Sequence, residues 1–391
     1  MKKVLFVIDS LACGGAEKSL VSLLPLLDFS ALDVDLMIMK NGGIFEHLIP
    51  PQVTVLPVPK VAPWLYRCCQ GLFSLERRWL HLLGIRRHGA ETYWKMMSRV
   101  HLAPFNSYDV AVAYHQGFPT YYVAEKVRAK RKWAWVNADL QQAGYRPKFN
   151  RPFYDRMTGV CAVSDSLPNM LANAGFVSPD KIRVIKDILN VDLIRRMANA
   201  PMRTFATSAP VKILTVGRLA PPKNYPLAIE AARRLLNYGL FFVWVFVGEG
   251  EEHNNVDTLI KQNGLKENII LAGLLPNPYP YFKACDIYVQ TSSFEGFGLT
   301  ISEAKILHKP IVTTNFPSAY DQIVDGENGL IAEMTPESVA EKIIRLIENP
   351  ALKNRLIENT HKEENRTAIT ESEKVNQLLL EDLNEDLHHH L

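Results

Sequence analysis

The stretch that decides the fold is Ser293-Phe294-Glu295-Gly296-Phe297-Gly298-Leu299-Thr300-Ile301-Ser302-Glu303-Ala304. It follows an apolar run at 287–290 and leads into a helical pattern at 300–307. Glycines in such a loop allow backbone amides and the positive end of the helix to approach a phosphate closely. The carboxylates Glu295 and Glu303 stand eight positions apart, where each could accept hydrogen bonds from sugar hydroxyls.

The same residues allow a plainer interpretation. Thr300-Ile301-Ser302-Glu303 fits a capping box, in which the Glu303 side chain only satisfies free amides at the start of the helix. This alternative stays open as long as the stretch is considered alone.

Apolar runs alternate with helical patterns on both sides of this stretch. The expected strands are 3–9, 34–39, 53–58, 110–113, 132–136 and 159–163 in the first half, and 211–216, 241–247, 269–272, 287–290 and 311–314 in the second. Helices are expected at about 16–27, at 225–237 and at 300–307. Strands separated by helices form parallel sheets. We therefore predict an α/β protein of two doubly wound, Rossmann-like domains, with a cleft between them at the carboxyl ends of both sheets.

The domain boundaries are expected where composition and charge change. We predict an N-terminal domain at 1–198, a linker at 199–210, a C-terminal domain at 211–360 and a helical tail at 361–391 that packs back on the N-terminal domain. Residues 1–198 carry 26 Lys and Arg against 16 Asp and Glu, whereas residues 199–391 carry 18 against 25. The net charges of +10 and −7 suggest that the first domain meets an anionic partner.

A segment at 60–102 interrupts the α/β pattern, and we predict a helical insertion there. It is rich in aromatic residues and carries eight Lys and Arg against two Glu. Together with the basic run at 126–132, it is expected to contact anionic lipid headgroups, where each cation contributes about 1 kcal/mol. The alternative is that the aromatic side chains belong to the core and the bases form a solvated surface.

Several classes of protein are disfavoured by the composition. The five cysteines have no metal-ligand spacing, and the adjacent Cys68 and Cys69 in an odd set argue against a disulfide framework. The apolar run at 4–8 is too short for a signal peptide, and no run is long enough to span a membrane. Asp33-Val34-Asp35 resembles a metal-binding pair but fits a solvated strand start better. We expect a cytoplasmic protein, peripheral on the inner face of the cytoplasmic membrane, with no bound metal, no cofactor and no nucleic-acid partner.

Five features in order along the chain resemble a known family, the retaining glycosyltransferases of the GT-B fold, of the family 4 type. The stretch at 293–304 resembles the Glu-x7-Glu signature of that family. The other four features are Gly14-Gly15-Ala16-Glu17, Gly217-Arg218-Leu219 with Lys223-Asn224, Val247-Gly248-Glu249-Gly250, and Asp325-Gly326-Glu327-Asn328-Gly329. The resemblance covers residues 3 to 345. It implies a GT-B enzyme that takes part in the synthesis of bacterial surface polysaccharide or glycolipid.

The resemblance also implies roles for residues of the second domain. Glu303 would hold the ribose of a nucleotide sugar, and Glu295 would contact the donor sugar. The loop formed by Gly296, Phe297, Gly298 and Leu299 would bring backbone amides to the β-phosphate.

Two cations are expected at the diphosphate, Arg218 and Lys223. The charge of the leaving nucleoside diphosphate grows as the glycosidic bond breaks, and fixed cations stabilise it. A surface salt bridge is the alternative role for Arg218.

Residues of the first domain complete the expected site. Gly14 and Gly15 would let the backbone approach the donor phosphate. His115 would contact the primary hydroxyl of the donor sugar, although a histidine after a strand can also be purely structural. Retention with help from the leaving phosphate requires no strong protein base, so no aspartate is assigned a catalytic role.

The resemblance thus predicts transfer of a hexose from a nucleotide sugar, a UDP-sugar by family frequency, to a glycan or lipid-linked glycan. Two alternatives are a nucleotide-sugar epimerase of the same architecture and a non-catalytic protein that binds sugar nucleotides. The epimerases lack the Glu295 and Glu303 string, and turnover distinguishes the non-catalytic protein from an enzyme.

Overall fold

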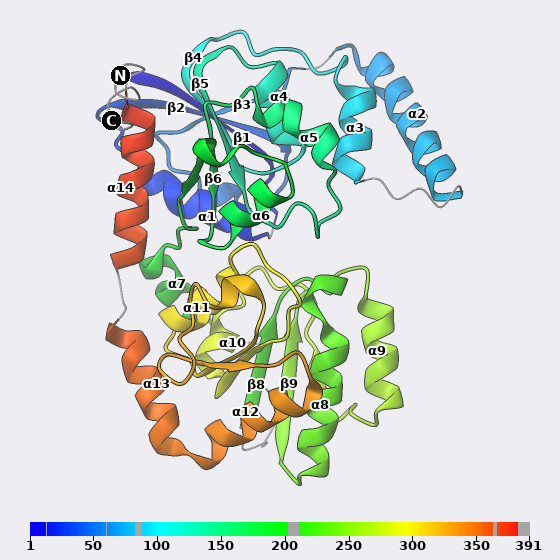
Figure 1. Cartoon of the computed structure of the whole chain (residues 1–391), viewed down its shortest axis with the longest axis vertical. Coiled ribbons are helices and arrows are strands. Elements are labelled where there is room, and N and C mark those ends of the chain that lie inside the picture. Colours follow the sequence, from blue (N-terminus) through cyan, green and yellow to red (C-terminus); the bar gives the residue numbers. More distant parts are fainter. Residues whose placement is uncertain (13, 60, 83–87, 202–210, 363–365, 382–391) are drawn as a thin grey trace. The chain divides into compact units, whose positions relative to one another are not determined.

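The computed structural model describes residues 1–12, 14–59, 61–82, 88–201, 211–362 and 366–381. The chain divides into two compact units (Figure 1). Unit 1 comprises Met1–Ile188 and Thr367–Leu391, and unit 2 comprises Leu189–Arg366. Most of the expected linker, 202–210, lies outside the described residues.

Unit 1 is built on a seven-stranded parallel sheet of order β3-β2-β1-β4-β5-β6-β7. The strands are β1 (Lys2–Ser10), β2 (Leu32–Lys40), β3 (Thr54–Leu56), β4 (Tyr108–Ala113), β5 (Ala129–Val136), β6 (Gly159–Ala162) and β7 (Ile182–Val184). Its helices are α1 (Gly15–Leu23), α2 (Pro63–Leu82), α3 (Gly89–Met97), α4 (Phe118–Glu125), α5 (Pro147–Tyr154), α6 (Leu167–Asn173) and α14 (Arg366–Leu380). The order reverses between β1 and β4, so the crevice of a doubly wound sheet lies at the carboxyl ends of these two strands.

Unit 2 repeats the arrangement with a six-stranded parallel sheet of order β10-β9-β8-β11-β12-β13. The strands are β8 (Val211–Val216), β9 (Phe242–Val247), β10 (Ile269–Leu271), β11 (Ile287–Gln290), β12 (Ile311–Thr314) and β13 (Leu330–Ala332). Its helices are α7 (Val191–Ala198), α8 (Tyr225–Asn237), α9 (His253–Gln262), α10 (Tyr279–Ala284), α11 (Leu299–Ile306), α12 (Pro336–Glu348) and α13 (Pro350–Lys362). All six residues of β9 are buried, as expected of a strand that is covered on both faces of the sheet. The order reverses between β8 and β11.

The two doubly wound sheets that the sequence predicts are therefore present, and the differences concern short elements and boundaries. The edge strands β7 and β13, with three residues each, have no strand in the sequence interpretation. The first unit ends at Ile188 and not at 198, because α7 packs on α10 and α11 of unit 2.

The insertion between β3 and β4 forms the two helices α2 and α3. Its aromatic residues divide between two environments. Trp94 is buried and belongs to the core, whereas Trp64 and Trp79 on α2 are exposed. The core interpretation thus holds for Trp94, whereas contact of the insertion with lipid headgroups stays a prediction.

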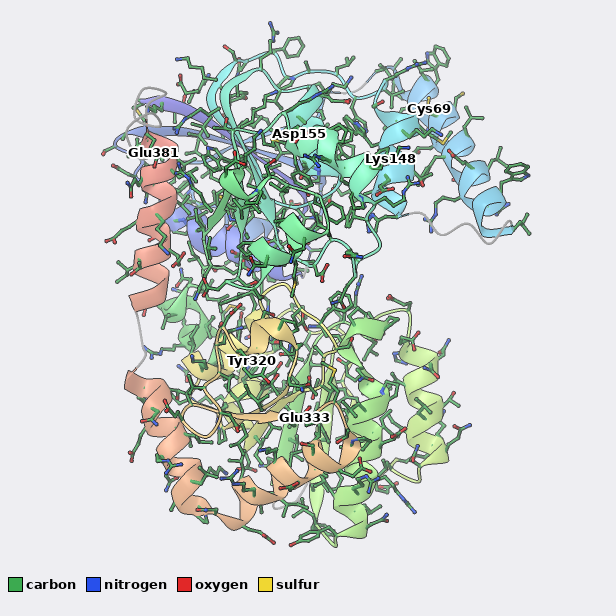
Figure 2. All side chains as sticks on the ribbon, in the orientation of Figure 1. Cys69, Lys148, Asp155, Tyr320, Glu333 and Glu381 are labelled. Atoms are coloured by element: carbon green, nitrogen blue, oxygen red, sulfur yellow. The ribbon has the colours of Figure 1, made fainter. Side chains whose placement is uncertain are left out.

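The C-terminal helix α14 packs on unit 1 (Figure 1). Val375, Leu378 and Leu379 are buried. Two arginines bind the last turn of the helix and Glu381, which follows it. Arg131 donates to the carbonyl oxygen of Leu379 at 3.0 Å and lies 3.7 Å from the Glu381 carboxylate. Glu381, labelled at the end of α14 in Figure 2, also accepts from Arg183.

Arg131 therefore belongs to the interior, although it forms part of the basic run at 126–132. Its neighbours in the run also have hydrogen-bond or ion-pair partners within unit 1. Lys130 pairs with Asp109 at 2.7 Å, and Lys132 donates to the carbonyl oxygen of Ala124. The expectation that this run joins the insertion as a surface for lipid headgroups therefore does not hold for the buried Arg131, and it stays a prediction for the exposed cations of the run.

Arg131→Ala is expected to lower the free energy of unfolding of unit 1 by about 3 kcal/mol, because it leaves the buried carbonyl of Leu379 without its donor and the Glu381 carboxylate with only one of its two arginines. Urea unfolding followed by tryptophan fluorescence measures this, since five of the six tryptophans lie in unit 1. Arg128→Ala, at an exposed position of the same run, is the control and should change the free energy by less than about 0.5 kcal/mol. Equal effects of the two substitutions would contradict the role given to Arg131.

Candidate functional site

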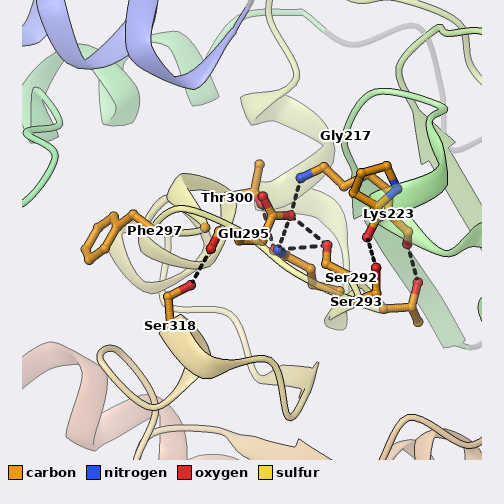
Figure 3. Close-up of polar contacts among 12 residues, drawn as sticks. Gly217, Lys223, Ser292, Ser293, Glu295, Phe297, Thr300 and Ser318 are labelled. Atoms are coloured by element: carbon orange, nitrogen blue, oxygen red, sulfur yellow. Dashed lines mark hydrogen bonds and ion pairs between the residues drawn. The ribbon is translucent and has the colours of Figure 1, made fainter. Parts of the chain in front are cut away.

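Glu295 lies in the loop that connects β11 to α11, and three donors hold one of its oxygens (Figure 3). Oε1 accepts from Ser292 Oγ at 2.6 Å and Gln290 Nε2 at 2.9 Å, and forms an ion pair with Lys223. Within the described residues no hydrogen bond reaches the other oxygen, Oε2. The carboxylate is thereby fixed in position with one oxygen available to a ligand.

Lys223 reaches Glu295 because its turn is tied to the same loop. Ser293 donates from its amide to the carbonyl oxygen of Pro222 at 2.8 Å, and Thr291 Oγ1 donates to the carbonyl oxygen of Lys223 at 3.0 Å. Asn224 takes a left-handed conformation, φ 50° and ψ 50°, that lets α8 begin directly after the turn. These contacts place the cation beside the carboxylate.

Gln290, the last residue of β11, is a positioning residue that the sequence analysis missed. It is buried, and its Oε1 accepts from Tyr288 OH at 3.0 Å and Thr300 Oγ1 at 2.8 Å. Its amide nitrogen donates to Glu295. Gln290 therefore joins the strand, the loop and the first turn of α11. The sequence signal for this role was a glutamine at the end of an otherwise apolar strand.

Two side chains hold the loop backbone at Phe297, Gly298 and Leu299. Gln322 Nε2 donates to the carbonyl oxygen of Phe297 at 2.5 Å, and Ser318 Oγ donates to that of Glu295 at 3.1 Å. Gly298 caps α11 with φ 89°, a conformation that favours glycine. The loop therefore leads directly into the positive end of α11.

Glu303 does not form the capping box that the sequence allowed. The N-cap of α11 is Gly298, and Thr300 Oγ1 is bonded to Gln290. Glu303 is 0% exposed and its Oε1 accepts from Tyr279 OH at 2.9 Å. A ligand hydroxyl can reach this carboxylate only after Tyr279 or another neighbouring side chain moves.

Arg218 follows β8 and is exposed. Within the described part of the chain it forms no ion pair, so the surface salt bridge proposed as its alternative role is absent there. Its loop lies against the turn after β9. A Cβ on Gly248 would lie 2.0 Å from the carbonyl oxygen of Gly217, which explains why glycine occupies that position.

The remaining candidates, Gly14, Gly15 and His115, lie in unit 1, whereas the others lie in unit 2. Gly14 caps α1, and a Cβ at this position would lie 2.1 Å from the Glu17 carboxylate. The missing side chain at Gly14 therefore leaves room for the Glu17 carboxylate in the first turn of α1.

His115 follows β4 and faces Asp9 at the end of β1. Its Nδ1 lies 3.4 Å from Asp9 Oδ2 and 2.9 Å from the carbonyl oxygen of Gln116. Burial pulls the pKa of His115 down, but the Asp9 carboxylate, with help from Glu17, raises it above the ordinary value of 6.5. With Nδ1 directed at two oxygen acceptors, Nε2 is the nitrogen left for a ligand.

A buried polar group lies near His115 and was also missed. Ser19 and Tyr114 share a hydrogen bond of 3.0 Å, and Ser19 Oγ accepts from the amide of Ile188 at 3.3 Å. Burial raises the pKa of the neighbouring Asp187 to about 7, against opposing effects of Ser19 and His115. Asp187 is therefore a buried carboxyl group whose pKa lies well above that of an ordinary aspartate.

No group of three or more His, Cys, Asp or Glu that could hold a metal ion occurs among the residues that the structure describes. Asp35 of the Asp33-Val34-Asp35 motif is buried, where it accepts from Tyr108 OH at 2.9 Å. No helix in the described part of the chain is both long and apolar enough to cross a bilayer.

Comparison with known proteins agrees with this geometry. Residues 203–363 match the family Glycosyl transferases group 1. The lipopolysaccharide core biosynthesis glycosyltransferase LpsE of Rhizobium meliloti is 30% identical over 49% of this chain and 56% of its own length. An N-acetylgalactosamine-N,N'-diacetylbacillosaminyl-diphospho-undecaprenol 4-alpha-N-acetylgalactosaminyltransferase of Campylobacter jejuni is 31% identical over 41% of this chain and 43% of its own length. The chain thus spans about half the length of these curated relatives.

Among solved structures, Anabaena HepE in complex with UDP and glucose superposes with a TM-score of 0.74. The match covers 97% of this chain and 99% of HepE, at 18% identity. At that identity the likeness concerns the fold, and the fold is GT-B.

The titration of His115 tests the geometry in unit 1. NMR should give a pKa above 6.5 that falls in Asp9→Asn, because the carboxylate stabilises the imidazolium. Since the pKa in the folded state is raised, the pair stabilises the fold fully below the ordinary histidine pKa, and this stabilisation is lost as the pH rises through the raised value. Asp33→Asn removes an exposed carboxylate and should leave the titration unchanged. A His115 that titrates alike in wild type and Asp9→Asn would contradict the assignment.

Proposed function

We propose that this chain is a glycosyltransferase that moves a hexose from a nucleotide sugar to a glycan or lipid-linked glycan, in the synthesis of a surface polysaccharide or lipopolysaccharide. The observation that carries the proposal is the Lys223–Glu295 pair, held in the loop before α11. This loop lies within the segment that matches the Glycosyl transferases group 1 family. A fixed carboxylate beside a cation and a helix N-terminus suits a sugar joined to a diphosphate.

In this proposal each group acts on a different part of the donor. The free Oε2 of Glu295 accepts hydrogen bonds from sugar hydroxyls. Arg218 and Lys223 stabilise the diphosphate as its charge grows, and the amides at 297–299 bind the β-phosphate. Glu303 binds the ribose once its buried carboxylate is uncovered.

The unit 1 residues would contribute from the other domain. Gly14 and Gly15 would allow close approach to the phosphate, and the His115 imidazolium would donate to the primary hydroxyl of the sugar. We propose retention of configuration without a metal ion or a protein base, as in the family 4 type. The charges that a metal would supply elsewhere come here from Arg218 and Lys223.

The donor and acceptor classes follow from the relatives and are also proposals. A UDP-sugar is the donor that we infer, because HepE is similar over nearly the whole chain and was solved with UDP and glucose. A lipid-linked acceptor is supported by the diphospho-undecaprenol in the name of the Campylobacter protein. Action at the cytoplasmic face of the membrane fits the UDP-sugar donor and the lipid-linked acceptor.

A panel of nucleotide sugars screened by thermal shift, with release of free nucleotide followed for each donor that stabilises the protein, tests the proposal. We expect stabilisation by a UDP-sugar and slow UDP release in water, faster with a lipid-linked acceptor. Interconversion of the sugar without UDP release would indicate an epimerase, and binding without turnover a non-catalytic protein. Either result would overturn the proposal.

Arg218→Ala is expected to lower the rate of UDP release about 100-fold, because it removes a cation that stabilises charge in the transition state. Donor affinity should change far less, since the same charge is only partly developed in the ground state. Arg233→Ala, an exposed arginine of α8, serves as the control. A loss of affinity with an unchanged rate would exclude this role for Arg218.

Glu303→Gln is expected to weaken UDP binding about tenfold, because an amide replaces a charged acceptor for the ribose hydroxyls. Tyr279→Phe is the matched variant, since it removes the hydroxyl bonded to Glu303 and keeps the carboxylate. Isothermal calorimetry should give undiminished affinity for Tyr279→Phe. Equal affinities of wild type and Glu303→Gln would mean that the carboxylate is structural.

A further inference from the structure

Helix α2 has two apolar stripes, of which only one is packed. Tyr66 and Phe73 face α3, where Tyr66 OH lies 3.1 Å from Tyr93 OH and the Phe73 ring meets the Tyr93 ring edge-on at 5.4 Å. The other stripe, here called the outer stripe, consists of Trp64, Cys68, Leu72, Leu75, Trp79 and Leu82. Its spacing of three and four residues places all six on one face of the helix.

The outer stripe lies in water in this structure. Its five large side chains are between 56% and 80% exposed, and Cys68 is exposed as well. Figure 1 shows α3 between α2 and the sheet, and Figure 2 shows side chains projecting from α2, marked by Cys69, at the margin of unit 1. A continuous apolar row of this length on a soluble surface indicates a binding face.

The charges on α2 identify the partner. Arg67 and Arg78 are eleven residues apart, which is close to three helical turns, so they lie in line beside the outer stripe. Within the described residues neither forms an ion pair, and both are exposed. The one acidic residue of α2, Glu76, follows Leu72 by four residues, at the edge of the outer stripe away from Arg67 and Arg78, and is half-buried. With Arg67, Arg77 and Arg78 against this one carboxylate, α2 is net positive and two copies would repel each other, whereas an anionic bilayer offers phosphates along its whole surface.

The composition of α2 suits a helix that lies on a bilayer surface better than one that crosses the bilayer. Its opposite face carries Gln70, Ser74 and Arg77, all exposed. A helix with Trp and Leu on one face and Arg on the other lies in the plane of the interface, with its apolar face about 5–10 Å into the headgroup and acyl boundary. Tryptophans near both ends match their preference for that depth.

We propose that α2 is a membrane-docking helix that places the outer stripe in the interface of an anionic bilayer and Arg67 and Arg78 on lipid phosphates. The proposal rests on α2 alone and does not need the basic run at 126–132, in which Arg131 is buried and Lys132 is bonded within unit 1. The proposal is independent of sugar transfer, because it depends on this helix alone.

Binding of the full-length chain to vesicles is the first test. Vesicles of phosphatidylcholine with phosphatidylglycerol should sediment the protein at low salt and release much of it at high salt, because screening weakens the arginine contacts. Vesicles of phosphatidylcholine alone should retain little. Failure to bind anionic vesicles would overturn the proposal.

Tryptophan fluorescence shows which part of the chain enters the lipid. Of the six tryptophans, Trp64 and Trp79 are exposed on α2, and the other four are buried in the core. Brominated acyl chains should therefore quench only the α2 signal, and the quenching should disappear in the variant Trp64→Phe with Trp79→Phe. Persistent quenching in that variant would place the contact elsewhere and contradict the proposal.

Variants separate the apolar and the charged contributions. Leu75→Ser and Trp79→Ser should each weaken vesicle binding about tenfold, and Arg67→Gln with Arg78→Gln about 30-fold. The matched controls are Phe241→Ser, which removes an exposed aromatic side chain from unit 2, and Arg233→Gln. Both should bind as wild type does, and thermal melting should show that all variants are folded.

A second copy of the chain is the competing occupant of the outer stripe. Sedimentation without lipid should show the same species for wild type and Leu75→Ser. A wild-type dimer that Leu75→Ser dissociates, or vesicle binding that the stripe variants leave unchanged, would overturn the proposal.

Discussion

The ion pair between Lys223 and Glu295 is the contact on which the candidate site in unit 2 depends. It joins the turn before α8 to the loop before α11, and so ties together the two strands, β8 and β11, between which the sheet order reverses. Gln290 and Ser292 also donate hydrogen bonds to the carboxylate. Because Lys223, Gln290 and Ser292 all bind the same oxygen of Glu295, the positions of the ammonium group and the carboxylate are set together.

The arginines of unit 1 show how the same residue type serves opposite purposes. Arg131 is buried and holds the end of α14, which returns to unit 1 after the chain has built unit 2. Arg67 and Arg78 are exposed and unpaired within the described residues, beside an apolar row. A cation with an internal partner stabilises the fold, whereas one without such a partner is available to an anion outside it.

The sequence predicts the long, regular elements and misses some of those defined by few residues. Strand β9 is apolar throughout and β1 has an apolar centre at Val4–Ile8, which identifies buried parallel strands without tertiary information. The edge strands β7 and β13, with three residues each, are missed, although β3 and β10, which are equally short, lie within the expected strands 53–58 and 269–272. The place of α7 in unit 2 is equally invisible, because it depends on packing against α10 and α11.

The sequence by itself determined the two doubly wound sheets and the loop that carries Glu295, since strand periodicity and glycine spacing are local properties. Only the tertiary structure decided between the roles open to single residues. Glu303 meets Tyr279 and leaves the cap to Gly298, and Trp94 is core whereas Trp79 is surface. The physical reason is that burial and hydrogen-bond partners are set by residues distant along the chain, which a local pattern does not contain.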